Sequence, residues 1–376
     1  ERHLKSDILN NKTNSITRLF FKINWSIYFF LTLLCILGGV ILYSVSGGNF
    51  HPLVSSHLIK YLISSLALFF CCFISINVLY KSSYVIYAFS IILLIAVLIL
   101  GNNDFGANRW LYLAGFTFQP SEFSKISLIV ILARYYNDYQ LINNNNFLKI
   151  LFPVFVIILP IILIINQPDL GTALMILVSS LSVVFLSGIG LPYIVISIIF
   201  FSLLTPLLWS SLYDYQKLRI ITFLNPENDP LGSGYHIAQS KIAIGSGGFL
   251  GKGYIKGSQS HLEFIPEIHT DFIFSIFSEE FGFFGSIFLI MIYCFVIGYG
   301  ILSSFNAKSI YNKLIISGLT MNIFLYFIVN ISMVIGLLPV VGVPLPLLSY
   351  GGSAMLVTMI SFGLIMNINN SQNEII

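Results

Sequence analysis

The chain has 376 residues and a formal net charge of +3; 57% of its residues are hydrophobic and only 9% are charged. Its mean hydropathy is +0.90. Soluble globular domains are about 45–50% apolar and about 25% charged, so this composition excludes an ordinary soluble protein. The cysteines all lie inside apolar runs, which predicts neither a disulfide framework nor a zinc site. They are Cys35, Cys71, Cys72 and Cys294.

Apolar runs of spanning length recur along the whole chain. A membrane-spanning helix needs roughly 20 mostly apolar residues. Ten runs qualify, of which the shortest, 121–136, begins with the polar letters SEFSK and is the weakest. The prediction is an all-α polytopic membrane protein forming a single domain over 1–376. The runs lie at 24–46, 58–80, 83–100, 121–136, 149–166, 171–188, 191–211, 280–303, 313–337 and 348–368.

The basic residues orient these spans, because short cytoplasmic loops collect Lys and Arg. This bias predicts that both termini are cytoplasmic, as the segments 1–22 and 369–376. It also predicts one large extracytoplasmic loop, 212–270, between the seventh and eighth spans. The basic residues on the inner side are Arg2, Lys5, Lys12, Arg18, Lys22, Lys81, Arg134, Lys149, Lys308 and Lys313.

Most carboxylates fall on the outer side of this map, and none lies near the middle of a confident span. Transporters usually keep ionisable groups or broken helices near the midplane. The pattern therefore favours work at the outer membrane–water boundary, although charges also gather in loops simply because water solvates them. The outer carboxylates are Asp104, Asp169, Asp214, Glu227, Asp229, Glu263, Glu267 and Asp271.

The stretch IPEIHTDFIF (265–274) places polar residues directly before an apolar run. From Asp271 to Ser303 there are 33 residues without proline. As one helix they would reach about 50 Å, longer than the hydrocarbon core of about 30 Å. Asp271, Ser275 and Ser278 would share a face with Gly282. This face is either a small-residue packing stripe with Asp271 as the N-cap, or part of a functional site.

Two further stretches carry charge at the predicted outer rim. GANRWLYLAGFTFQPSEFSK (106–125) holds Arg109, Trp110, Glu122 and Lys125. A Glu and a Lys three residues apart on a helix usually form a local ion pair, but beside Arg109 they could also hold a headgroup phosphate. GSGGFLGKG (245–253) fails the spacing of a phosphate-binding P-loop, so glycine-rich loop geometry is the better interpretation.

The remaining polar motifs are short. NQPDLGTA (166–173) predicts a tight turn whose Asp169 caps the next helix. In YDYQKLRI (213–220), Lys217 and Arg219 are two residues apart and do not share a helix face. VPLPLLSYGGSAM (343–355) predicts a broken backbone at the outer end of the last span.

Taken together and in this order, the motifs resemble the SEDS family of bacterial cell-wall proteins. The similarity covers nearly the whole chain from the first span onward. Within the family, GSQSHLEFIPEIHTDF (257–272) resembles the elongation branch, RodA, more than the division branch, FtsW. The motifs are NRWLYL, QPSEFSK, QPDLGTA, LGSGYHIAQSKIAIGSGGFLGKG, HLEFIPEIHTDFIFS, EEFGFFG and PLPLLSYGGSAM.

The resemblance implies a peptidoglycan glycosyltransferase that polymerises lipid II into β-1,4-linked glycan outside the bacterial cytoplasmic membrane and releases undecaprenyl pyrophosphate. The essential aspartate of the family corresponds to Asp271, the expected general base of an inverting transfer. Lys217 stands where close relatives have arginine. The positions expected to bind substrate are Arg109, Trp110, Glu122, Lys125, Asp169 and Arg219.

The leaving pyrophosphate needs positive charge nearby. The candidates are Arg109, Lys125, Arg219 and Lys241, or a divalent cation such as Mg²⁺ or Mn²⁺, and the sequence does not choose among them. His269 either supports Asp271 or is simply solvated.

The resemblance also implies partners: a class B penicillin-binding protein, the transpeptidase that cross-links new strands, and elongation proteins such as MreC and MreD. Nothing in the sequence predicts nucleic-acid binding. Two rival functions remain open on the sequence alone, a carrier that moves lipid II or another polyprenyl lipid across the membrane and a non-catalytic scaffold of the cell-wall synthesis complex.

Overall fold

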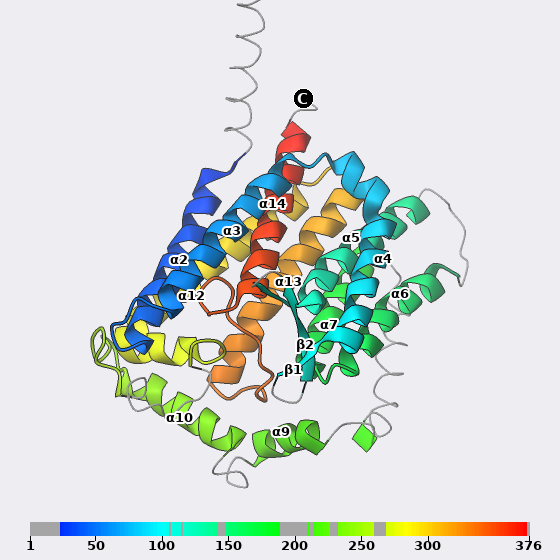
Figure 1. Ribbon diagram of the computed structural model, residues 1–376. Helices are drawn as coiled ribbons and strands as arrows, with labels where there is room; N and C mark the ends of the chain where they lie inside the picture. Colours follow the sequence, from blue (N-terminus) through cyan, green and yellow to red (C-terminus); the bar gives the residue numbers. More distant parts are fainter. Residues whose placement is uncertain are drawn as a thin grey trace, which may run out of the picture.

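The computed structural model describes residues 23–104, 107–113, 116–140, 148–188, 209–210, 214–225, 232–258 and 268–373. The expected N-terminal segment 1–22 lies outside the described residues, as do nearly all of the expected seventh span, 191–211, and parts of the expected loop 212–270. Within the described part the chain forms a helical bundle with one small sheet (Figure 1).

Six of the described helices are long and apolar enough to cross a membrane. Two shorter apolar helices, α6 (Leu148–Ile165) and α7 (Leu170–Leu186), pack against each other. The chain is therefore mostly helical and polytopic. The six are α2 (Trp25–Val45), α3 (Leu53–Phe73), α4 (Ile76–Leu100), α12 (Ile273–Phe305), α13 (Ile310–Val334) and α14 (Gly352–Asn373).

The expected second span, 58–80, has the wrong bounds. Helix α3 ends at Phe73, and Ser75 begins α4 by accepting a hydrogen bond from the backbone N–H of Val78 at 3.4 Å. The apolar run continues through this turn, so hydropathy alone does not reveal it. A serine N-cap supplies the local stop-and-start signal.

Helix α5 (Pro120–Gln140), which contains the weakest expected span, 121–136, is not among these six helices and lies inside the bundle. It packs against α4, α6, α7, α13 and α14, and the residues from Ile126 to Ala133 are all buried. A helix surrounded by protein need not be uniformly apolar, provided that its polar groups find partners. Glu122 and Lys125 in its first turns meet that condition, as described below.

A small antiparallel sheet joins α4 to α5, so the all-α prediction was wrong in this detail. Strand β2 (Ala107–Leu113) lies between β1 (Asn102–Asp104) and β3 (Phe116–Phe118). Trp110 pairs with Asn102, and Leu111 pairs with Phe118. The sheet fixes the strand that carries Arg109 and Trp110 to the end of α5 that carries Glu122.

Helix α12 is interrupted at Gly282, which has φ 66° and ψ −161°, so the expectation of one unbroken helix over 271–303 was wrong. The glycine-rich segment 247–253 packs against this break. The backbone N–H of Lys252 donates to the carbonyl of Glu279 at 3.0 Å, and that of Phe283 donates to the carbonyl of Gly248 at 2.9 Å. A Cβ on Gly251 would lie 2.0 Å from the carbonyl oxygen of Glu280, so this close approach requires glycine.

Different helices and strands lie at the two ends of the bundle. Helices α9 (Asp214–Leu224) and α10 (Ser233–Ser246) lie across one end, and the sheet reaches that same end (Figure 1). The start of α2 and the end of α14 lie at the opposite end (Figure 1). Asp271 belongs to the first of these, which we call the Asp271 end.

Candidate active site at the Asp271 end

Asp271 lies in a turn at 268–272 that leads into α12, and it is half-buried. The N-cap position of α12 is Phe272, so the interpretation of Asp271 as an N-cap was wrong. Its carboxylate lies beside Gly342, where a Cβ, if the residue had one, would be 3.5 Å from Oδ2. Gly342 has φ +77°, a conformation that side chains rarely adopt, so the backbone leaves room for the carboxylate.

Gly342 also lines a cavity of about 100 Å³ that we call the Lys125 cavity. The strand β2, the first turns of α5 and α7, helix α13 and the segment 342–354 all contribute to its wall. Five of the sequence-predicted residues, from the rim motifs and the Asp169 turn, therefore meet beside Asp271. They are Arg109, Trp110, Glu122, Lys125 and Asp169.

The Lys125 ammonium and the Glu122 carboxylate form the predicted ion pair, at 2.8 Å, and both residues are buried. The hydroxyl of Tyr326 bridges them: Lys125 Nζ donates to it, and it donates to Glu122 Oε2. A buried ion pair stays favourable only when hydrogen bonds satisfy its remaining atoms. Tyr326, from α13, supplies such bonds and was not identified from the sequence.

Asp169 ends the turn before α7 and caps that helix, as predicted. Its Oδ1 accepts from the backbone N–H of Thr172 at 3.2 Å, and its Oδ2 accepts from the Thr172 hydroxyl at 2.8 Å. Oδ2 also accepts from Nε2 of Gln119 at 3.2 Å. This carboxylate therefore holds α7 against the start of α5.

Arg109 reaches from β2 to the same turn. Its Nε donates to the carbonyl of Gln167 at 3.2 Å, and an Nη donates to the carbonyl of Pro168. A guanidinium has five N–H donors, so these two bonds leave others for a ligand. Arg109 lines both the Lys125 cavity and a neighbouring one.

The neighbouring cavity, of about 130 Å³, holds a second arginine, and we call it the Arg219 cavity. Arg219 lies on α9 and donates from Nη1 to the carbonyl of Val340 at 3.2 Å. Arg109 and Asp169 line both cavities, so the two cavities share a wall. Two guanidinium groups and an ammonium thus line two neighbouring cavities.

Three predicted residues lie elsewhere, and none lines either cavity. Lys217 is on the other side of α9 from Arg219, as the spacing predicted. The Lys241 side chain crosses Gly336, where a Cβ would lie 2.2 Å from its Cε. His269 is half-buried, and its carbonyl accepts from the backbone N–H of Tyr350 at 2.8 Å.

The size of the two cavities limits what they can hold. Sites for drug-sized ligands are roughly 300–1,000 Å³, and each of these cavities is smaller. Lined by Arg109, Arg219 and Lys125, they fit a charged group such as a phosphate rather than a whole sugar. Arginine suits phosphate because its planar fork donates two parallel hydrogen bonds.

Among the described residues, no group of three or more His, Cys, Asp or Glu side chains could hold a metal ion. Magnesium, however, is often bound through one or two carboxylates together with substrate phosphates. Asp271 offers one carboxylate of this kind beside the cavities. The donor set therefore fits a divalent cation only when a phosphate ligand completes it.

Comparison with known proteins places the chain in a family. The family described as "Cell cycle protein", which covers FtsW, RodA and SpoVE, matches residues 24–374. The chain belongs to the SEDS family. It is a multi-pass membrane protein, and the RodA branch is favoured over FtsW by the relatives that follow.

One relative is the peptidoglycan glycosyltransferase MrdB of Escherichia coli K12, 45% identical over 289 residues that cover 76% of each chain. Among solved structures, a crystal structure of RodA from Thermus thermophilus is 25% identical with a TM-score of 0.70, covering 93% of this chain and 97% of that one. A structure described as a peptidoglycan synthase complex that coordinates polymerisation and crosslinking is 27% identical with a TM-score of 0.80, covering 93% and 98%.

Proposed function

We propose that this chain is a peptidoglycan glycosyltransferase that polymerises lipid II into β-1,4-linked glycan strands during cell elongation and releases undecaprenyl pyrophosphate. The single observation that carries this is the Asp271 carboxylate beside Gly342, a residue that lines the cavity holding Lys125 and Arg109. The Asp271 carboxylate can accept a proton, while the Lys125 ammonium and the Arg109 guanidinium can stabilise the negative charge of a leaving phosphate. The name of the relative from Escherichia coli, a peptidoglycan glycosyltransferase, points to the same activity.

The site would face outward from the bacterial cytoplasmic membrane, in a chain of ten spans with both termini in the cytoplasm. The placement of α2 and α14 supports this, because the start of the first described helix and the end of the last lie at one end of the bundle, opposite α9 and α10 (Figure 1). An outward site suits a substrate whose sugar and peptide lie outside and whose prenyl chain lies in the bilayer.

In the proposed reaction Asp271 takes the proton from the 4-hydroxyl of the acceptor sugar. The hydroxyl oxygen forms a bond to the anomeric carbon of the donor, and the bond from that carbon to the pyrophosphate oxygen breaks. Attack from the opposite face inverts the anomeric centre without a covalent enzyme intermediate. A positioned base of this kind contributes on the order of 10²–10⁴-fold to the rate.

The negative charge that develops on the leaving pyrophosphate would be met by Arg109 and Arg219, which share one cavity, and by Lys125 in the next. Donors fixed before the reaction stabilise such charge more effectively than water does, because they need no reorganisation. If a divalent cation binds, Asp271 would supply one carboxylate ligand and substrate phosphates the others, and the cation would add positive charge for the leaving group. Trp110 and Asp169 would shape the cavity around the headgroup.

The expected partner is a class B penicillin-binding protein, the transpeptidase that cross-links the new strands. A structural relative described as a peptidoglycan synthase complex that coordinates polymerisation and crosslinking supports this partnership. MreC and MreD-type proteins are expected neighbours in the elongation complex.

The test is polymerisation of purified lipid II in liposomes, with Mg²⁺ or Mn²⁺ supplied. The wild-type chain and Asp271→Ala would each be co-purified with the cognate transpeptidase, whose acyl-transfer site is inactivated. We expect polymer from the wild type and none from a normally folded Asp271→Ala variant.

Equal polymer from both proteins would remove Asp271 from the chemistry and direct attention to Glu122 or Asp169. No polymer from either, where a control synthase works, would refute the proposed activity and favour a lipid carrier or a scaffold.

A further inference from the structure

Asn330 is an amide buried in the apolar helix α13, with 0% of its surface exposed. Its Nδ2 donates two hydrogen bonds, one to the carbonyl of Asp271 at 2.8 Å and one to the carbonyl of Val343 at 2.7 Å. Its Oδ1 is buried without a hydrogen-bond partner. A buried amide that leaves one atom unsatisfied is costly, so the two bonds that Asn330 does make require an explanation.

The two carbonyls that Asn330 joins flank the Asp271 carboxylate. One belongs to Asp271 itself, and the other belongs to the residue after Gly342, against which Oδ2 of Asp271 lies. One side-chain amide thus sets the distance between the turn that carries the carboxylate and the segment that lines the Lys125 cavity.

The carbonyls of three consecutive residues are held in the same manner. That of His269 accepts from the backbone N–H of Tyr350 at 2.8 Å, that of Thr270 accepts from Oγ of Ser349 at 2.6 Å, and that of Asp271 accepts from Asn330. The backbone of the turn is therefore held at three successive carbonyls. Of these three bonds, the one from Asn330 is to the carbonyl of Asp271 itself.

We propose that Asn330 is a positioning residue for the general base: through the backbone of Asp271 and the carbonyl of Val343 it sets where the carboxylate lies at the Lys125 cavity. This inference rests on the proposed function. A displacement of about 1 Å between reacting groups can reduce the rate about 10²-fold. Loss of the two Asn330 hydrogen bonds should therefore lower kcat more than it changes KM.

The chain offers a matched control on the same helix. Asn322 lies eight residues before Asn330, is 1% exposed, and also has a buried Oδ1 without a hydrogen-bond partner. It does not line the Lys125 cavity. Replacing either asparagine by leucine exchanges one buried amide for an apolar side chain of similar size. The two variants differ chiefly in the hydrogen bonds to the carbonyls of Asp271 and Val343, which only Asn330→Leu loses.

The first readout is steady-state polymerisation of lipid II by the complex with its transpeptidase. We expect Asn330→Leu to lower kcat about 10²-fold with the KM for lipid II within about threefold of the wild type. Asn330→Gln, which keeps the two N–H donors on a longer stem, should lose about tenfold. Asn322→Leu should keep both constants within about threefold.

The second readout does not depend on activity. Hydrogen exchange of the Tyr350 amide, which is bonded to His269, should accelerate about tenfold or more in Asn330→Leu and remain unchanged in Asn322→Leu. This reports directly whether the turn at 268–272 has separated from the 343–350 segment.

The proposal is overturned if Asn330→Leu keeps the wild-type kcat, if it loses activity no more than Asn322→Leu, or if exchange at Tyr350 does not change. Two other outcomes would identify a failure of the proposed function itself, which removes the basis of this inference as well. They are full activity of Asp271→Ala, and no polymer from the wild type where a control synthase works.

Discussion

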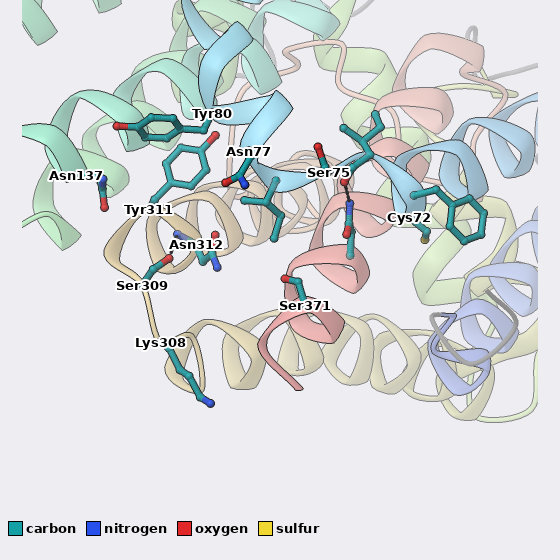
Figure 2. A pocket seen from close by; sticks show the side chains of 14 residues that line it. Cys72, Ser75, Asn77, Tyr80, Asn137, Lys308, Ser309, Tyr311, Asn312 and Ser371 are labelled. Carbon is teal, nitrogen blue, oxygen red and sulfur yellow. Dashed lines mark hydrogen bonds between the residues drawn. The ribbon is translucent and has the colours of Figure 1, made fainter. Parts of the chain in front are cut away.

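Both ends of the bundle contain hollows lined by described residues, and one at the end without Asp271 is larger than either the Lys125 or the Arg219 cavity. The opposite-end pocket, lined by the ends of α3 and α14, the start of α4, and residues near Asn137 and Lys308, measures about 570 Å³ (Figure 2). The Lys125 and Arg219 cavities measure about 100 and 130 Å³. Volume alone would therefore not favour the Asp271 end, where we propose the active site.

The polar groups at the two ends do different work. Around the opposite-end pocket they terminate helices. Ser309, at the start of α13, accepts from the backbone N–H of Asn312 at 3.1 Å (Figure 2). Asn367 donates to the carbonyl of Cys71 at 2.9 Å. Satisfying helix ends is a structural requirement of any helical bundle. Of the described residues that line this pocket, one is a lysine, Lys308, and none is a carboxylate.

At the Asp271 end, charged groups from segments far apart in the sequence converge instead. Tyr326 lies 204 residues from Glu122, which it contacts, and Asn330 lies 59 residues from Asp271. Gathering buried charge at one place costs free energy, so it persists where the charges have a use. Convergent charge, rather than volume, is therefore the reason to propose the active site at the Asp271 end.

The largest effect outside Asp271 itself should come from Arg219. We expect Arg219→Ala to lower kcat/KM for lipid II about 10²-fold, because it removes a preorganised donor from the cavity that it shares with Arg109. Lys217→Ala, a change two residues away on the other side of α9, is the control and should remain within about twofold. Equal losses in both variants would mean that α9 contributes only general positive charge.

The buried Glu122–Lys125 pair should affect stability as well as activity. Lys125→Met leaves Glu122 buried without its cation, so we expect a fall in melting temperature of roughly 5–10 °C in detergent. The double variant Lys125→Met with Glu122→Gln should recover much of this loss, because it removes the uncompensated charge. A single variant as stable as the wild type would contradict the account of this pair.

The smallest effect should come from the opposite-end pocket. Asn312→Ala removes a side chain that lines it, and we expect the polymerisation rate to remain within about twofold of the wild type. A loss of tenfold or more in a stable protein would show that the larger pocket also serves the reaction, so that the two ends would no longer differ in function.

The local features of the site could be predicted from the sequence. Three features depend on residues within a few positions of one another. They are the helix cap at Asp169, the Glu122–Lys125 ion pair, and the placement of Lys217 and Arg219 on opposite sides of α9. Local spacing on a helix or turn fixes such geometry, so it can be predicted without knowing the fold.

The remaining features depend on long-range packing. The break at Gly282 exists because the segment 247–253 packs against α12, and neither stretch alone shows this. Tyr326 and Asn330 stood in the sequence as polar residues within an apolar run, a signal that marks them as unusual but does not name their partners. The sheet at 102–118 was missed because its strands are short and lie between two apolar runs.

The most direct test of the central claim is the initial rate of lipid II polymerisation by Asp271→Asn. This substitution preserves the shape of the side chain and removes its capacity to accept the proton. The account predicts a loss of at least about 10²-fold relative to the wild type, with the protein still folded and still bound to its transpeptidase. A rate within about threefold of the wild type would contradict it.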